Sequence, residues 1–194
     1  MLMDIVTTIK ASVSAEAGKG VWNDPNVDPI AEINKAIIAI YGATGIVPNN
    51  IVFDFGAWSV FSANKKILER MPGADIASVT PGRVRSLFVN PNMNVEIATA
   101  AAITSGGGGV GSTTAKKQSV MRTSTFLFYN SANPTPYDPS FCKTFSPSKT
   151  LFTDIFTYRE EPHLDWYENN WTADTKLVAS ALCKRIDCST AYDE

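Results

Sequence analysis

Apolar residues recur every three or four positions in two segments near the start of the chain. Spacing of this kind places them on one face of an amphipathic helix. Asp28-Pro29 precedes the second segment, and a capping carboxylate followed by proline favours a helix start there. We predict one helix over residues 2–13 and another from Pro29 that ends at Gly42. Their apolar faces consist of Leu2, Ile5, Val6, Ile9 and Val13 in the first helix and Ile30, Ile33, Ile37, Ile40 and Tyr41 in the second.

Shorter patterns follow in the middle of the chain. The apolar run at residues 51–53 is typical of a buried strand. Hydrophobic positions over residues 58–68 predict a helix or a pair of helices that ends near Pro72. A further short helix is predicted to begin at Thr80-Pro81 and to stop at Asn90-Pro91.

The second half of the chain favours strands. A glycine-rich segment lies between the first two of them, and the proline-containing residues 131–149 predict an irregular, extended connection. Helices with one strand come first and strands mostly follow, which predicts an α+β fold. The predicted strands of this half are residues 95–97, 125–129, 151–160 and 177–186.

Composition and charge narrow the class of protein. The chain has 194 residues, of which 44% are hydrophobic and 19% charged, so it is typical of a globular protein. Its mean hydropathy is -0.04, and it has no apolar run long enough to predict a membrane-spanning helix. The formal net charge of -2 gives no electrostatic reason to expect strong nucleic-acid binding.

The three cysteines do not form a metal-binding or redox motif. Cys183 and Cys188 are separated by four residues, and Cys142 leaves the total odd. We therefore expect three reduced thiols in a reducing compartment, with Cys183 the least tolerant of substitution by serine because it lies in an apolar run.

The glycine-rich segment, residues 106–113, is the sharpest candidate for chemistry. It satisfies G-x-G-x-x-G, a pattern in which backbone N–H groups bind phosphates. However, Ser112 occupies the place of the P-loop lysine, and no acidic residue stands about 20 positions further on to bind a ribose. We favour a surface loop, and a nucleotide-binding enzyme remains the alternative.

Other candidate groups predict no catalytic centre. His163 is the single histidine, so a multi-histidine metal site is excluded. The adjacent carboxylates of Glu160 and Glu161 would face opposite sides of a strand. We assign no catalytic, metal or cofactor residues and expect a protein that is not an enzyme. An adaptor or ligand-binding domain that uses the aromatic residues near Trp166 is a third reading.

Four segments, taken in order, resemble a known family. Residues 22–30 resemble a W-x-D-x-x-x-x-P segment before a long helix, and residues 45–52 resemble a G-x-x-P-N-x-L-V turn and strand. Residues 64–71 resemble a helix that reads I-E-R, and residues 79–89 resemble V-T-x-x-x-L-A-x-L-F-x-V. This series, over roughly residues 20–187, is similar to the major capsid protein of tailed phages and prophages, the Hong Kong 97-type fold that encapsulins share.

The resemblance implies a division of the chain into an axial domain, with a central sheet and flanking helices, and a partial peripheral domain. Residues 1–27 would be the end of the spine helix and its connection, and residues 28–130 the axial domain. Residues 131–175 would form a β-ribbon of the peripheral domain. Residues 176–194 would hold the strand that returns to the axial sheet, followed by a tail.

The resemblance also implies a function. It predicts a structural subunit that self-assembles into pentamers and hexamers of an icosahedral head enclosing DNA, without a cofactor. Scaffold and portal proteins would be further partners, DNA contact would be weak, and no membrane would be involved. The protein would lie in the host bacterial cytoplasm and then in the virion capsid. An encapsulin-like compartment is the alternative within this class. Residues near a symmetry axis would be Gly107, Gly108, Val110 and Ser112.

Complete members of the family carry an N-terminal arm and an extended loop before the spine helix. By this resemblance the chain begins inside that helix. We therefore expect it to fold but to form weak oligomers rather than closed shells.

Overall fold

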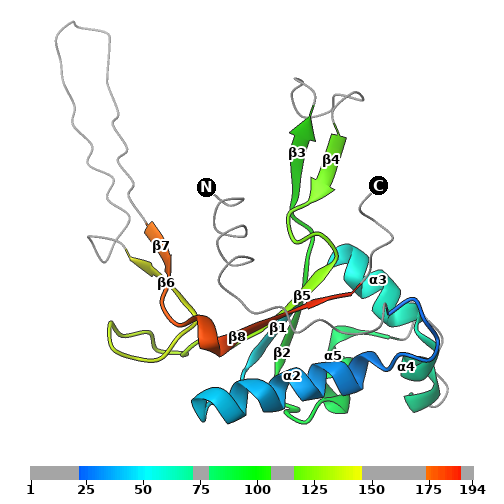
Figure 1. Ribbon diagram of the computed structural model, residues 1–194, viewed down its shortest axis with the longest axis horizontal. Coiled ribbons are helices and arrows are strands. Elements are labelled where there is room, and N and C mark those ends of the chain that lie inside the picture. The colour runs from blue at the N-terminus through cyan, green and yellow to red at the C-terminus, as the bar shows by residue number, and fades with distance from the viewer. Residues whose placement is uncertain (1–21, 72–78, 106–115, 146–173, 189–194) are drawn as a thin grey trace, which may run out of the picture.

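The computed structural model describes residues 22–71, 79–105, 116–145 and 174–188. Within these residues a four-stranded sheet has helices packed on one face, and two hairpins project from it (Figure 1). The elements in chain order are α2 (Pro29–Thr44), β1 (Asn50–Asp54), α3 (Phe55–Ala63), α4 (Lys65–Arg70), α5 (Pro81–Val84), the 3₁₀ helix η2 (Arg85–Leu87), β2 (Asn94–Ala98), β3 (Ala101–Ser105), β4 (Lys116–Ser119), β5 (Ser124–Phe128), β6 (Cys142–Phe145), β7 (Asp174–Leu177), the 3₁₀ helix η3 (Ser180–Leu182) and β8 (Cys183–Asp187).

The sheet has the strand order β2-β1-β5-β8. β1 pairs with β2 in parallel, and the other neighbours are antiparallel. β3 pairs with β4, and β6 pairs with β7, as separate antiparallel hairpins. In Figure 1 the β3–β4 hairpin extends from one end of the sheet and the β6–β7 hairpin lies on the other side of the molecule.

The main core lies between one face of the sheet and the helices. Alternation along β1 directs Ile51 and Phe53 to this face, and both are fully buried. Four of the five isoleucines of α2 pack against them, as do residues of α3, α4 and α5. A smaller cluster on the opposite face contains Phe126, Phe141, Leu182 and Cys183.

Trp22 closes one end of the core. Its indole is buried and contacts the rings of Phe53 and Phe61, and its Nε1 donates to Glu32 of α2 at 2.7 Å. Its backbone nitrogen donates to Cys188 at the end of β8. Asn64, the residue between α3 and α4, donates its side-chain amide to the Trp22 carbonyl at 2.8 Å. The segment before α2 is thus fixed to both the sheet and the helix pair.

Asp54 fixes the junction of β1, α3 and the β3–β4 hairpin. Its carboxylate is buried and accepts from the backbone nitrogen of Gly56, which caps α3, and from that of Thr123 at 3.2 Å. The Ser119 hydroxyl at the end of β4 donates to the other carboxylate oxygen. Arg122 and Thr123 both have positive φ, a conformation that costs free energy in residues other than glycine. The hydrogen bonds to Asp54 hold the chain in this turn.

The helix predictions from Pro29 onward are confirmed, with changes at one end of α2. Asp28 caps α2 by accepting from two backbone nitrogens, and α3 with α4 forms the predicted helix pair. The helix does not end at Gly42, however, but continues to Thr44, where Gly45 adopts the left-handed conformation of a C-cap. Tyr41 was predicted to lie on the apolar face of this helix, but it is 55% exposed and does not belong to the core.

The prediction of one last strand over residues 177–186 is wrong. β7 ends at Leu177 and pairs with β6, whereas β8 joins the four-stranded sheet, because the turn at η3 redirects the chain between them. The connection at residues 131–149 contains β6, although the pattern of residues there predicted no strand. The predicted helix at residues 2–13 and strand at residues 151–160 lie outside the described residues.

None of the helices in the described part of the chain is both long and apolar enough to cross a membrane.

We expect Asp54→Ala to lower the free energy of unfolding by about 2–4 kcal/mol, since it removes a helix cap and leaves buried donors without an acceptor. The matched control is Asp24→Ala, because that carboxylate accepts one exposed hydrogen bond from Asn26; it should cost less than about 0.5–1 kcal/mol. Urea unfolding followed by tryptophan fluorescence measures both. Equal losses would show that Asp54 does not hold the junction.

We expect Cys183→Ser to destabilise the fold by about 1–3 kcal/mol and Cys188→Ser by less than about 1 kcal/mol. Cys183 lies among Phe126, Phe141 and Leu182, where a hydroxyl is buried in apolar surroundings. The Cys188 sulfur already contacts the Thr125 hydroxyl at 3.1 Å, so a serine there keeps a partner. Denaturant unfolding of the two variants gives the order, and the reverse order would contradict this reading.

Candidate functional site

The described residues offer little reactive chemistry. They contain no group of three or more histidine, cysteine, aspartate or glutamate residues that could hold a metal ion. Burial raises the pKa of the Cys183 and Cys188 thiols, which keeps both protonated at neutral pH. A thiol in that form is a poor nucleophile, so the surfaces and cavities of the described residues are the remaining candidates for function.

The predicted interface residues Gly107, Gly108, Val110 and Ser112 lie outside the described residues, as do His163 and Trp166. The described strands β3 and β4 nevertheless flank the glycine-rich segment as a hairpin, in which Ala101 pairs with Ser119. No local pattern predicts these two strands, because their mostly small and polar residues do not alternate with large hydrophobic side chains.

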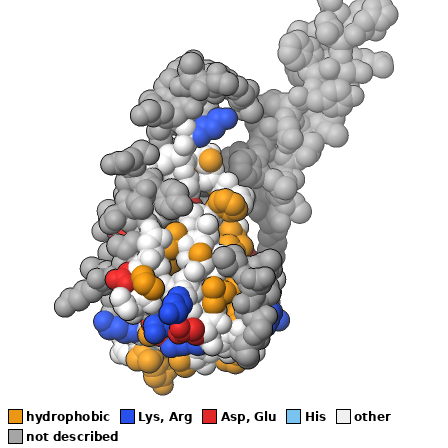
Figure 2. Space-filling model, turned by 90° about the vertical axis from the view of Figure 1, so that its right-hand side faces the viewer, with side chains coloured by type: hydrophobic (Ala, Val, Ile, Leu, Met, Phe, Trp, Pro, Cys, Tyr) orange, Lys and Arg blue, Asp and Glu red, His pale blue; other side chains and the backbone are white. Residues whose placement is uncertain are grey.

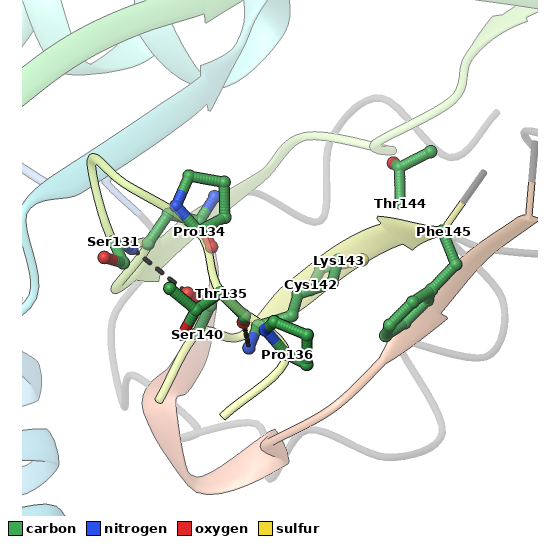
Figure 3. Close-up of a pocket in the computed structure, with 10 residues that line it drawn as sticks. Ser131, Pro134, Thr135, Pro136, Ser140, Cys142, Lys143, Thr144 and Phe145 are labelled. Carbon is green, nitrogen blue, oxygen red and sulfur yellow. Dashed lines mark hydrogen bonds between the residues drawn. The ribbon is translucent and has the colours of Figure 1, made fainter. Parts of the chain in front are cut away.

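A hollow of about 590 Å³ lies between β6 and the preceding loop (Figure 3). Polar and apolar residues both line it, and the buried Lys143 is the charged residue among those named below. The residues that line it are Asn130, Ser131, Pro134, Thr135, Pro136, Ser140, Cys142, Lys143, Thr144 and Phe145.

The Lys143 ammonium is committed to the loop itself. Its Nζ donates to the carbonyl oxygens of Thr135 at 2.7 Å and Asp138 at 2.6 Å, and to the Asp138 carboxylate at 3.0 Å. An ammonium has three donors, and all three are used. Lys143 therefore holds the loop closed and has no hydrogen left for a ligand.

Asp138 is equally occupied. Its carboxylate accepts from the Ser140 hydroxyl and from the Thr135 backbone nitrogen and hydroxyl, in addition to Lys143. The Ser140 hydroxyl, followed by Lys143 and Thr135, holds the pKa of Asp138 well below its usual range, against the opposing effect of partial desolvation. The result is a rigid turn over residues 135–138, which we call the Tyr137 turn. At its tip the Tyr137 side chain is 96% exposed.

A second hollow, of about 320 Å³, lies on the outer face of α2 and is almost wholly apolar. We call it the α2 groove. Ile38 and Val89 are 60% and 62% exposed, which is unusual for aliphatic side chains of their size on one continuous surface. The groove is lined by Ile37, Ile38, Tyr41, Val47, Val89 and Asn90.

The charged side chains of the described residues do not form a concentrated basic surface on the face shown in Figure 2. Basic and acidic groups there lie close to one another, among hydrophobic and uncharged side chains (Figure 2). The groove and the Tyr137 turn are thus the features of the described surface that call for an explanation.

We expect the free energy of unfolding of the wild type and of Asp138→Asn to differ at pH 7 and to converge below about pH 4. The hydrogen bonds lower the pKa of Asp138 in the folded chain, so its contribution is present above the unfolded pKa of roughly 4 and is lost as the pH falls toward the folded value. Thermal unfolding across pH 2–7 measures this, with Asp24→Asn as the control. A difference that stays constant down to pH 2 would contradict it.

Comparison with known proteins gives a result at the level of the fold. No protein-family model matches the sequence, and no curated protein matches it significantly. Among solved structures, the chain is similar to the crystal structure of a phage-related protein from Bordetella bronchiseptica RB50, with a TM-score of 0.73 and 21% sequence identity. The match covers 92% of this chain and 58% of that chain, so this chain spans somewhat more than half of its neighbour's length. The α+β fold of the chain is therefore one that a phage-related protein shares.

Proposed function

We propose that this protein is a structural subunit of a phage or prophage capsid, which associates with further copies of itself to form a protein shell around DNA. The observation that carries the proposal is the agreement of two independent comparisons. The ordered sequence segments resemble tailed-phage capsid proteins, and the fold is similar over 92% of the chain to a phage-related protein.

The arrangement of elements supports a specific assignment. The sheet β2-β1-β5-β8 with its helices would be the axial domain, to which β8 returns from the far end of the chain. The β6–β7 pair would be the base of the peripheral β-ribbon. The β3–β4 hairpin would carry Gly107, Gly108, Val110 and Ser112 toward a local symmetry axis.

The described surface also fits an assembly role better than a catalytic one. The polar groups of the larger hollow bond to one another, and large apolar side chains are exposed on a rigid framework. Exposed apolar patches of this kind mark sites of protein–protein contact. Scaffold and portal proteins would be further partners, DNA contact would be weak, and the protein would end in the virion.

The purified chain should associate reversibly as its concentration rises. We expect sedimentation velocity to show a monomer of 21.0 kDa at low concentration and small oligomers at high concentration, with ring-shaped particles in negative-stain images. Dilution is the control, since assembly reverses on dilution and aggregation does not. A chain that stays monomeric up to roughly 1 mM, where specific contacts of only about 4 kcal/mol would be visible, would refute the proposal.

A further inference from the structure

We propose that the Tyr137 turn of one copy inserts into the α2 groove of a second copy, and that the two copies exchange this contact across a two-fold axis. The inference rests on the proposed function, because it names one surface through which copies of the chain associate. A two-fold exchange closes at a dimer, so rings require a further contact between dimers. It does not follow from the fold similarity, which says nothing about these side chains.

The Tyr137 side chain has no packing role within its own chain. It is 96% exposed, the highest fraction among the exposed large hydrophobic residues of the described chain. A tyrosine ring in this state leaves nearly all of its ~150–250 Å² in water. It is also flanked by Pro136 and, after Asp138, by Pro139, which restrict the backbone on both sides.

Hydrogen bonds on both sides of Tyr137 in sequence hold the backbone that carries the ring. Pro136 occupies the second position of the turn, which proline favours, and the Thr135 hydroxyl accepts from the Asp138 backbone nitrogen at 3.2 Å. The Lys143 ammonium donates to the carbonyls of Thr135 and Asp138, which lie before and after Tyr137 in the sequence. A backbone held this firmly loses little conformational entropy on binding, and only the rotamer of the Tyr137 side chain has to be fixed, which suits an anchor at an interface.

The α2 groove is equally preformed. The backbone nitrogen of Val89 donates to the Asn34 side chain at 3.0 Å, and the Asn90 side chain donates to the Pro48 carbonyl at 3.0 Å. These bonds fix the 89–90 segment against α2 and the turn that follows it, so that the groove stays open. Its volume of about 320 Å³ accommodates one aromatic side chain. The amide of Asn90, which also lines the groove, would be a hydrogen-bond partner for the hydroxyl of an inserted tyrosine.

The turn and the groove lie at the same end of the molecule. The side chain of Asn49 both donates to and accepts from the backbone of Asn130, which begins the loop, and Asn49 directly follows the groove-side Pro48. Figure 1 shows the end of α2 and the loop before β6 on the same side of the sheet. A knob and a hole on one end pair reciprocally about a two-fold axis.

The expected contact area matches this pairing. One tyrosine in one groove is too small for a stable interface, which requires about 1,000 Å² in total. A two-fold exchange counts each surface twice, and the exposed rings of Tyr137 and Tyr41 together with Ile38 and Val89 bring the buried area to the order of 1,000 Å². The buried area thus reaches that of a stable interface when both copies insert their tyrosine, and falls short of it when only one does.

The first test is Tyr137→Ala, compared by sedimentation equilibrium with Phe55→Ala. Phe55 is a matched control, because it is an exposed aromatic residue, 64% accessible, at the start of α3. Tyr137→Ala should weaken self-association at least tenfold with an unchanged melting temperature, Val89→Glu should have the same effect from the groove side, and Phe55→Ala should have none. Equal effects of Tyr137→Ala and Phe55→Ala would overturn the inference.

The second test locates the contact. Tyr137→Cys and Val89→Cys chains, mixed and oxidised, should give a dimer with a disulfide between positions 137 and 89, identified by peptide mass spectrometry. Tyr137→Cys mixed with Ser59→Cys, an exposed position on α3, should not. Self-association that survives Tyr137→Ala and yields no such crosslink refutes this inference and leaves the proposed function standing. A wild-type chain that never associates refutes both.

Discussion

The buried carboxylate of Asp54 is the interaction on which the described fold depends most. It ends a central strand, caps α3, and accepts from Thr123 and Ser119, which lie where the β3–β4 hairpin passes into β5. A bulky side chain at Gly56 would collide with Thr123, since an added Cβ would lie 2.9 Å from its Cγ2. The hydrogen bonds to the Asp54 carboxylate offset the free-energy cost of the positive φ of Arg122 and Thr123. They also set the direction in which the hairpin leaves the sheet.

The polar side chains of the Tyr137 turn also form their hydrogen bonds within the chain. In the Tyr137 turn, a lysine, an aspartate and two hydroxyls satisfy one another, so their hydrogen-bonding capacity goes into shape and not into ligand binding. Large apolar side chains are exposed at the α2 groove and at Tyr137. This arrangement supports the role in assembly that we propose.

Helices and central strands could be predicted where the local pattern and the tertiary environment agree. Ile30, Ile33, Ile37 and Ile40 of α2 have helical spacing and are buried, and Asp28-Pro29 is a strong start signal. Prediction failed where burial is set by distant partners. Tyr41 continues the apolar spacing of α2, yet no described element covers it. The apolar pattern from Leu177 to Ile186 predicted one strand, but the η3 turn divides it between two sheets.

The sequence by itself determined the α+β class, the helix boundaries near Asp28 and Thr80, and the inner strands, because hydrophobic periodicity and capping act over a few residues. Only the tertiary structure decided which apolar residues stay exposed. The α2 groove joins α2 to Val47 and Val89, and the Tyr137 turn depends on Lys143 bonding back across the loop. The α2 groove joins residues that are distant in sequence, so it depends on long-range packing. The Tyr137 turn depends on the burial of the Lys143 ammonium among its acceptors, which no helix or strand periodicity encodes.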